Sequence, residues 1–286
     1  MKQPVTAIYL AQKRASKKLN KMKRSIFLAI VVISPLVMFA QGNKYEYTPK
    51  VKNRVEIVNL LGEISLKNTT GNAIVVESDF DMEKPERAEG LKLLGAMEDN
   101  TNLGINVTEE NGVVTISGIT KKVRDYSYTI SIPQGIVVNL DYNSPFAGSD
   151  VEVESYSGSL EIKTLNADVK LTDCTGPLTI SSISGNVEAV FSSINQGEPS
   201  SLASVSGYID ITVPGGSKAS FEINNVTGNV YNNLDLKNVN PEKEDKRAEG
   251  LASVKHSNGK NSYTLNGGGS KVFLKSISGN IYLRKK

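Results

Sequence analysis

Residues 157–187, SGSLEIKTLNADVKLTDCTGPLTISSISGNV, repeat one short pattern at a fixed interval. Gly158, Ala167, Gly176 and Gly185 stand nine residues apart. Each is followed by a polar–apolar–polar–apolar tetrad, and this alternation has the period of a β-strand. A glycine at a constant offset indicates a turn that needs positive φ or close backbone approach. The pattern therefore predicts a repeat protein built of short β-strands.

The same pattern recurs outside this stretch at wider spacing. The further copies contain Gly62, Gly112, Gly207, Gly228 and Gly279. Intervals of 9, 21 and 22 residues indicate a coil of about 18 to 22 residues that contains two or more strands. Stacked coils of this length form a parallel β-solenoid, in which each coil buries its apolar side chains against the next. The predicted fold class is all-β, a right-handed, single-stranded β-helix with short antiparallel additions in its N-terminal part.

An apolar residue stands two positions before several of these glycines, with a Ser or Thr between them. Cys174, Ile183, Val205, Val226 and Ile277 occupy this position. Because a hydroxyl next to glycine favours a turn, we expect these five residues to be buried at the inward position before the turn. Cys174 is the only cysteine, so it is expected to be a small buried hydrophobe, with no intrachain disulfide.

The first 41 residues differ in composition from the rest of the chain. They contain eight Lys and Arg, no acid, and the apolar run Ile26–Ala40. A basic segment and a short apolar run before a small residue are typical of a secretory signal peptide. We predict that residues 1–41 are a leader and signal peptide, with translation starting at Met1 or Met22. An uncleaved anchor is the alternative, although the run is shorter than the roughly 20 residues of a bilayer span.

The leader also accounts for the basic charge of the chain. The whole chain has 33 Lys and Arg and 30 Asp and Glu, and without residues 1–41 its net charge is −5. Such a chain lacks the basic face that nucleic acid requires. We expect an exported protein, in the periplasm, on the cell surface or outside the cell. We expect no nucleic-acid partner and no stable membrane span after cleavage.

The rest of the chain is predicted to form two parts of one elongated fold. Residues 42–140 are the N-terminal β-rich part, with a charged insertion near 80–102. Residues 141–286 hold the regular repeats, with a charged loop near 238–260. The polar C-terminus, Arg284–Lys286, is expected to protect an exposed sheet edge against aggregation.

The Ser-Gly-x-apolar-x-apolar pattern, the strand Tyr128–Gly135 that ends in Ile-Pro-x-Gly, and the signal peptide resemble bacterial adhesin-like families of β-strand-repeat proteins. The head-domain type of autotransporter adhesins is similar. The likeness covers roughly Val51 to Leu283, and the leader's Phe39-Ala40-Gln41 resembles leaders of Bacteroidetes-type bacteria. The resemblance implies a β-solenoid of unknown function without established catalytic residues. A fold of this kind does not by itself imply a function.

Residue types that could carry out catalysis are few. His256 is the only histidine, and we expect it in an exposed polar loop, where it cannot form a His-rich metal site. Calcium binding by Asp79 and Asp81, or by Asp150, lacks the spacing of a calcium loop. Carboxylates also lie at or near outward strand positions, at Asp150, Glu152, Glu154, Glu161 and Asp168. β-Helical lyases and hydrolases use such residues, but any half-solvated strand shows the same alternation. We predict no catalytic, cofactor-binding or metal site and no enzyme activity.

Exposed aromatic side chains are the remaining candidates for ligand binding, although the chain has no Trp and only 6% aromatic residues. Tyr208, Tyr231 and Tyr282 stand at outward positions after the repeated glycines, where successive coils would align them, and Tyr156 also lies near a turn. Tyrosines suit strand surfaces without binding anything, so a purely structural role is the alternative.

Two functions follow from these observations. The first is an exported, non-enzymatic, adhesin-like structural and interaction module, with an envelope polysaccharide or protein as its partner. The alternative is a carbohydrate-binding or carbohydrate-active β-helix. An aligned cluster of outward acids in a groove would favour the alternative.

Overall fold

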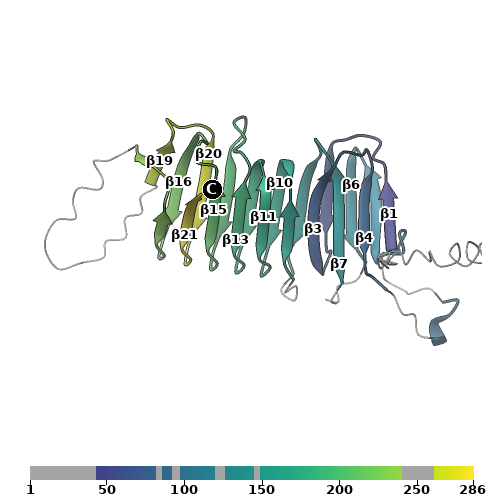
Figure 1. The fold of residues 1–286 in the computed structure, drawn as a ribbon. Coiled ribbons are helices and arrows are strands. Elements are labelled where there is room, and N and C mark those ends of the chain that lie inside the picture. Colours follow the sequence, from purple (N-terminus) through teal and green to yellow (C-terminus); the bar gives the residue numbers. More distant parts are fainter. Residues whose placement is uncertain (1–42, 82–85, 92–96, 120–125, 145–148, 240–260) are drawn as a thin grey trace, which may run out of the picture. The chain divides into compact units, whose positions relative to one another are not determined.

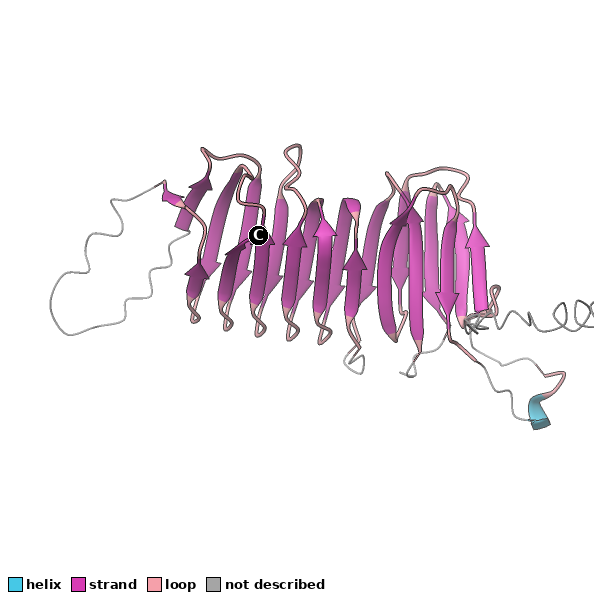
Figure 2. Ribbon diagram, in the orientation of Figure 1, coloured by secondary structure: helices cyan, strands magenta, loops and turns pink. Residues whose placement is uncertain are grey.

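The computed structural model describes residues 43–81, 86–91, 97–119, 126–144, 149–239 and 261–286. Gly42–Lys286 is a compact unit by itself. The predicted leader, both candidate start positions (Met1 and Met22) and His256 lie outside the described residues. The described structure consists of strands and turns (Figure 1, Figure 2), with one helical element in these ranges, the 3-10 turn Glu86–Ala88. The predicted all-β class is therefore confirmed.

The strands form two large sheets, which we call sheet A and sheet B. In spatial order, sheet A consists of β1 (Asn43–Tyr47), β4 (Ile74–Ser78), β7 (Ser127–Pro133), β3 (Glu63–Thr69), β9 (Val151–Glu154), β11 (Val169–Cys174), β13 (Val187–Phe191), β15 (Ile209–Val213), β21 (Ile281–Lys285) and β17 (Val230–Asn232). Sheet B consists of β18 (Lys237–Asn238), β19 (Asn261–Leu265), β16 (Ala219–Asn225), β20 (Lys271–Ser276), β14 (Ser200–Ser204), β12 (Gly176–Ser182), β10 (Ser157–Thr164), β8 (Val137–Tyr142), β2 (Arg54–Val58), β6 (Val113–Gly118) and β5 (Ile105–Glu110).

Consecutive strands of the regular region alternate between the two sheets. We call a strand of sheet B, the following strand of sheet A and the turn between them a rung. From β8 to β15 each rung lies beside the previous one, with parallel strands. Leu160 and Ile162 of β10 pair with Leu178 and Ile180 of β12, and all four are buried. The inward orientation predicted for the apolar members of the tetrads is confirmed at these residues.

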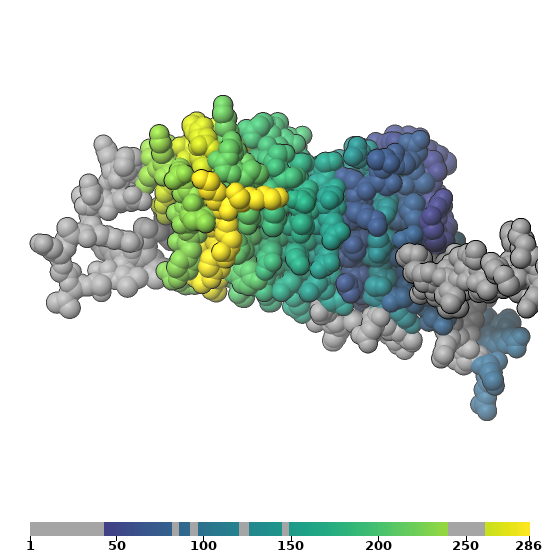
Figure 3. All heavy atoms as spheres, in the orientation of Figure 1, coloured from purple at the N-terminus to yellow at the C-terminus, as the bar shows by residue number. Residues whose placement is uncertain are grey.

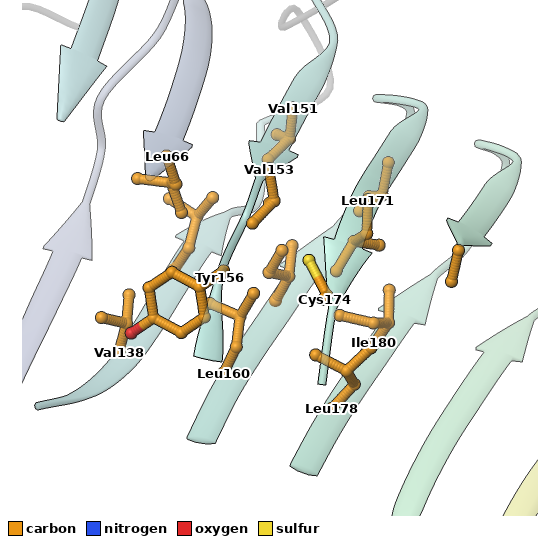
Figure 4. Close-up of a cluster of buried hydrophobic side chains, with 14 of the residues drawn as sticks. Leu66, Val138, Val151, Val153, Tyr156, Leu160, Leu171, Cys174, Leu178 and Ile180 are labelled. Carbon is orange, nitrogen blue, oxygen red and sulfur yellow. The ribbon is translucent and has the colours of Figure 1, made fainter. Parts of the chain in front are cut away.

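Among the core residues between the sheets are Cys174 and Tyr156, two residues considered in the sequence analysis for their functional groups. Figure 4 shows the sulfur of Cys174 among the aliphatic side chains of the core, near Leu171 and Ile180. Cys174 is 1% exposed, and burial raises the pKa of its thiol to about 11. Tyr156 is buried as well, and its hydroxyl donates to the carbonyl oxygen of Ile136 at 3.1 Å. The predicted burial of Cys174 is confirmed, and Tyr156 is a core residue.

Four aliphatic residues that the sequence placed in the core are exposed, so that prediction is wrong. They are Ile183, Val205, Val226 and Ile277, with exposed fractions of 47, 39, 41 and 38%. Cys174 is not equivalent to them, because it ends a strand of sheet A, whereas the four follow strands of sheet B. A spacing of nine residues is half a coil, so successive glycines mark opposite corners of the stack.

The inward residue at the corner after sheet B is polar, and it bonds to the turn that follows. Ser182 and Ser204 are buried. Their hydroxyl oxygens accept hydrogen bonds from the backbone N–H groups of Gly185 at 2.8 Å and Gly207 at 2.9 Å. These serines close the turn. Since side chains alternate along a strand, the aliphatic residue that follows each serine faces outward.

The glycines of this corner are required because neighbouring rungs lie very close together. A Cβ at Gly207 would lie 2.1 Å from the carbonyl oxygen of Gly185. A Cβ at Gly279 would likewise lie 2.0 Å from the carbonyl oxygen of Gly207, and a Cβ at Gly228 would lie 2.0 Å from the carbonyl oxygen of Gly279. The φ angles of these glycines lie outside the left-handed range. Of the two reasons considered for a repeated glycine, close approach is the one that applies here.

At both ends of the stack, the order of the rungs departs from the order of the chain. The pair β20–β21 lies between the rungs β14–β15 and β16–β17. In Figures 1 and 3 the yellow C-terminal segment accordingly has green segments on both sides. The pair β2–β3 is likewise inserted between β6–β7 and β8–β9. The prediction that Arg284–Lys286 protects a sheet edge is therefore wrong, because the edge strands of sheet A are β1 and β17.

Antiparallel strands occur at the N-terminal end, as predicted, in the pairs β1–β4, β4–β7 and β5–β6. The C-terminal end also has antiparallel strands, where β19 pairs with β16 and β18, and these were not predicted. The insertion near 80–102 is described in part, and its residues 86–91 are mostly exposed. The charged loop near 238–260 lies largely outside the described residues.

Candidate functional site

Three tyrosines lie in a row on the outward face of sheet A, and we call them the tyrosine ladder. Tyr208 directly precedes β15, Tyr282 lies on β21 and Tyr231 lies on β17. The rings of Tyr231 and Tyr282 are stacked, with centroids 5.4 Å apart and planes at 12°. The rings of Tyr208 and Tyr282 meet edge to face, with centroids 6.1 Å apart and planes at 83°. The structure brings together the three tyrosines selected from the sequence, and a ligand on them stays a prediction.

The ladder depends on the inserted position of β21. Tyr231 and Tyr282 are register partners on neighbouring strands, and Asp210 of β15 is the partner of Tyr282 on its other side. Tyr282 therefore lies between the other two rings. Exposure increases toward the edge strand, from the half-buried Tyr208 to Tyr231, which is 51% exposed.

A groove of about 240 Å³ lies on the same face, and we call it the acidic groove. It is lined by Asp150, Glu152, Asp168, Val169, Lys170, Asn186 and Glu188. Three of these, Asp150, Glu152 and Asp168, are among the five outward carboxylates selected from the sequence. With four carboxylates and a single lysine, the groove disfavours anionic ligands.

The carboxylates of the groove differ in their surroundings. Burial raises the pKa of Asp150, and the nearby charges of Asp168 and Glu152 raise it further. Asp168 is fixed by Asn186, whose backbone N–H donates to Oδ1 at 2.7 Å and whose Nδ2 donates to Oδ2 at 3.1 Å. The groove therefore presents positioned oxygen acceptors, which suit a ligand that carries hydroxyl or amino groups.

Two hydrogen bonds join the acidic groove to the tyrosine ladder. The Tyr208 hydroxyl donates to Oε1 of Glu188. This bond, together with burial, raises the pKa of Tyr208 to about 12. The backbone N–H of Tyr208 donates to Oδ1 of Asn186 at 3.1 Å. Residues that line the groove thus hold the first ring of the ladder, and the two features form one continuous surface.

Arg284 is placed beside the middle ring of the ladder. Its Nε donates to the two carboxylate oxygens of Asp210 at 2.8 and 2.9 Å. Its guanidinium carbon lies 5.5 Å from the centroid of the Tyr282 ring, within the range of a cation–π contact. Because exposed ion pairs add little stability, we assign the Arg284–Asp210 pair the role of positioning Tyr282.

Other residues selected from the sequence lie outside the acidic groove and the tyrosine ladder. Glu154 ends β9 and does not line the groove. Glu161 lies on sheet B and pairs with Lys163 at 2.7 Å. Asp79 accepts a hydrogen bond from the backbone N–H of Ser127 at 2.7 Å. Within the described ranges, no group of three or more His, Cys, Asp and Glu side chains is arranged to hold a metal ion.

The residues of this face that were not selected from the sequence include Asn186, Glu188 and Arg284. A signal for two of them exists in the repeat. Asn186 stands one residue after its glycine, as Tyr208 does, and Glu188 stands three residues after it, as Tyr231 and Tyr282 do. Aligning the tetrads by their glycines would have placed both residues on the face of the ladder.

Two facing sheets of mostly parallel, stacked strands define this chain as an all-β repeat protein. Residues 146–268 match the family model Toastrack DUF4097. This matched segment, similar to the Toastrack DUF4097 domain, includes most of the strands of the acidic groove and the tyrosine ladder.

Among solved structures, the chain is similar to three with low sequence identity. One is a putative cell adhesion protein from Clostridium sporogenes, with 12% identity over 86% of this chain and 100% of that chain and a TM-score of 0.43. The second is a putative adhesin from Bacteroides fragilis, with 15% identity over 84% and 95% of the two chains and a TM-score of 0.36. The third is a putative adhesin from Parabacteroides merdae, with 12% identity over 86% and 98% and a TM-score of 0.24.

The match of residues 146–268 confirms the family resemblance predicted from the sequence. No curated protein matches the chain. Within the residues that the structure describes, no helical segment has the length and hydropathy needed to cross a bilayer.

Proposed function

We propose that this protein is an exported, non-enzymatic, right-handed β-solenoid that acts as an adhesin-like interaction module in the periplasm or on the cell surface. The observation that carries the proposal is the continuous outward face of sheet A, where the acidic groove meets the tyrosine ladder through Tyr208 and Glu188. Repeat proteins bind through such extended faces, with contacts spread over successive repeats. The predicted signal peptide, residues 1–41, supports export.

The state of the candidate catalytic groups supports binding rather than catalysis. The thiol of Cys174 is buried and its pKa is raised to about 11, so little nucleophilic thiolate forms near neutral pH. Asp168 is held by two hydrogen bonds from Asn186. The hydrogen bonds from Asn186 hold the Asp168 carboxylate in one orientation, which suits recognition.

The acidic groove favours a carbohydrate as the partner. Sugar hydroxyls donate hydrogen bonds to carboxylates, and tyrosine rings pack against the apolar faces of sugar rings. Outward acids in a groove were the feature that we expected to favour the alternative function, a carbohydrate-binding or carbohydrate-active β-helix. A carbohydrate-active β-helix that uses Asp150 and Asp168 is therefore the second candidate.

Retention of the protein on insoluble cell-envelope polysaccharide tests the proposal. In the test variant, Tyr208, Tyr231 and Tyr282 are all replaced by Ala. In the matched control, Thr179, Phe273 and Glu222, which form an outward row on sheet B, are replaced by Ala. We expect the ladder variant to lose retention and the control to keep it, at equal circular dichroism.

Two results would overturn this assignment. Equal retention of the ladder variant and the wild type would remove the ladder from the binding face. Release of soluble oligosaccharides that Asp150→Asn or Asp168→Asn abolishes would replace the module by the enzyme. In that case one residue would dominate the activity, as in a catalytic unit.

A further inference from the structure

The last rung of the stack, β16–β17, is covered on sheet B and open on sheet A. Sheet B continues past β16 with β19 and β18, whereas β17 is the last strand of sheet A. The end of the core is closed by Leu234, which is 6% exposed, and by Leu236, which packs against the core. The strand β17 itself keeps a free side, and we call Asn229–Asn232 the open edge.

The open edge lacks a hydrogen bond that the earlier rungs make. From β3 to β21, the first inward residue of each sheet A strand of these rungs donates its backbone N–H to a carbonyl oxygen of the next rung. The bonds are 2.9–3.2 Å long and join Ile64 to Asp150, Val151 to Asp168, Val169 to Asn186, Val187 to Tyr208, Ile209 to Asn280 and Ile281 to Asn229. Val230, the register partner of Ile281, is the next residue of this series. Within the part of the chain that the structure describes, no carbonyl oxygen accepts from its N–H.

The side chain of Val230 departs from the series in the same way. The inward residues Ile209 and Ile281 are fully buried, and so are their equivalents in the preceding rungs. Val230 points inward with them, but it is 42% exposed. Its exposure follows from the position of β17, which has a neighbouring strand on one side only. The rung therefore ends in an apolar residue that a further strand would bury.

Two side chains beside the open edge continue the pattern of the earlier rungs. Oδ1 of Asn186 accepts from the backbone N–H of Tyr208 at 3.1 Å, and Oδ1 of Asn280 accepts from that of Asn229 at 2.9 Å. Asn229 is the next residue of this row, and it is exposed. At the corner of the same rung, Nδ2 of Asn225 is buried and has no hydrogen-bond partner. Because buried polar groups are normally paired, an acceptor is missing at this corner.

The strands of sheet B decide what can occupy the open edge. A second copy that paired through its own β17 would bring its β16 to the level that β19 already fills. At the other end of the stack, β1 extends one strand past sheet B, which ends at β5, so it does not match an overhang of two strands. A single extended peptide needs no second sheet, because β19 already lies at the facing position. Its alternating N–H and C=O groups are the partners that a free strand edge requires.

We propose that the open edge takes up an extended segment of a partner protein as a further strand of sheet A, parallel to β17. The N–H of Val230 donates to a carbonyl oxygen of the segment, and the N–H two residues later in the segment donates to the carbonyl oxygen of Val230. The N–H of Asn232 donates to the following carbonyl of the same side. An apolar side chain of the segment covers Val230, and its polar neighbours point outward beside Tyr231. The partner is therefore a peptide that is apolar at alternate positions.

Fluorescence anisotropy with a labelled synthetic peptide tests the pairing. The probe has the sequence of residues 184–191, SGNVEAVF, which contains the corner and strand β13 of one rung. One methylated form carries N-methyl groups at the positions of Glu188 and Val190, whose backbone groups face the preceding rung in this protein. The matched control carries them at the positions of Val187 and Ala189, which face the following rung. We expect the first form to bind at least about tenfold more weakly than the unmodified peptide, and the control to bind like it.

Variants of the protein locate the binding on the open edge. Val230→Pro removes the free N–H and leaves the bonds to β21, since proline is tolerated on edge strands. Val230→Lys places an inward charge on the edge, which opposes strand addition. Both should bind the peptide at least about tenfold more weakly than the wild type, at equal circular dichroism. Tyr231→Ala, which keeps the backbone of the edge, is the control and should bind normally.

The same variants separate this proposal from the proposed function. The variant that lacks all three ladder tyrosines should still bind the peptide, and Val230→Pro should keep its retention on polysaccharide. Three results would overturn the strand proposal. These are no saturable binding of the unmodified peptide up to about 1 mM, equal weakening by the two methylation patterns, and a wild-type dimer that Val230→Pro converts to a monomer. The last result would make a second copy the occupant of the edge.

Discussion

Tyr231 stacks on Tyr282 with ring centroids 5.4 Å apart, because the C-terminal strand β21 is inserted beside β17. Tyr282 also meets Tyr208 on its other side. Tyr282, the middle ring of the candidate binding face, thus comes from β21. This strand follows both β15 and β17 in the chain but lies between them in sheet A. The binding face and the strand order are therefore coupled.

The stacked pair should show a measurable coupling energy. A double-mutant cycle of Tyr231→Ala and Tyr282→Ala, followed by urea unfolding, should give about 0.5–1.5 kcal/mol of coupling, as aromatic pairs do. Tyr231→Ala combined with Phe273→Ala on sheet B should be additive, because these residues lie on opposite faces. Additivity in both cycles would mean that the two rings do not interact in solution.

Two isoleucines near the corner after sheet B, Ile180 and Ile183, should differ in the stability lost when each is replaced by Ala. Ile180 is 1% exposed, whereas Ile183 is 47% exposed. Ile180→Ala should lower the free energy of unfolding by about 2–5 kcal/mol through the lost burial and the cavity. Ile183→Ala should cost about 0.5 kcal/mol. Chemical denaturation of both variants measures the difference, and comparable losses would contradict the outward orientation of Ile183.

Two glycines should respond in opposite ways to a methyl group. At Gly207 an added Cβ would lie 2.1 Å from the carbonyl oxygen of Gly185, whereas at Gly216 nothing lies within 4 Å. Gly207→Ala should therefore cost at least about 1–3 kcal/mol, because the stacked rungs must separate. Gly216→Ala should be neutral or slightly stabilising, since it restricts the unfolded chain. Thermal unfolding of the two variants tests this, and a tolerated Gly207→Ala would mean that the rungs are not so closely stacked.

The bond between Tyr208 and Glu188 should give an alkaline pH dependence. The pKa of Tyr208 is raised from 10.0 to about 12, because its neutral hydroxyl donates to a carboxylate. A raised pKa in the folded state means that the contribution to stability is complete below pH 10 and is lost as the pH rises toward 12. The stability difference between wild type and Tyr208→Phe should shrink over that interval. A difference that is constant with pH would mean that the bond is absent.

Removal of the last strand pair should be far more damaging than removal of an edge strand. Deletion of residues 271–286 takes away β20 and β21, which pair with neighbours on both sides. Deletion of residues 43–47 takes away β1, which among the described strands pairs with β4 alone. The first deletion should abolish the cooperative unfolding of the C-terminal rungs, and the second should leave a folded protein. Circular dichroism and size-exclusion chromatography compare the two truncated proteins, and a folded product of the first deletion would contradict the inserted position of β20 and β21.

The sequence predicted local features of this fold well and long-range ones poorly. Leu178 and Ile180 were assigned to the core because period-two alternation is a property of adjacent residues. Ile183 was misplaced because its surroundings depend on which corner of the coil it occupies, and nine-residue spacing does not distinguish the corners. The position of Tyr282 could not be predicted, because each repeat can pair equally well with several others. Prediction of the acidic groove requires the same strand register, so the position of Glu188 near Asp168 was not predicted.

The insertion of the two terminal strand pairs also decides the order in which the chain can fold. Only the rungs from β8 to β15 follow one another in both sequence and space. The pair β2–β3 is synthesised first, yet one of its two neighbours is the later rung β8–β9, and β16–β17 must wait for β20–β21. Winding that begins at the amino end can place β6–β7 on one side of β2–β3 and β8–β9 on the other, and it can continue as far as β14–β15. It stops there, because β16–β17 contacts the stack only through β20–β21. The C-terminal rungs therefore close last, through contacts between residues far apart in sequence, which slows folding.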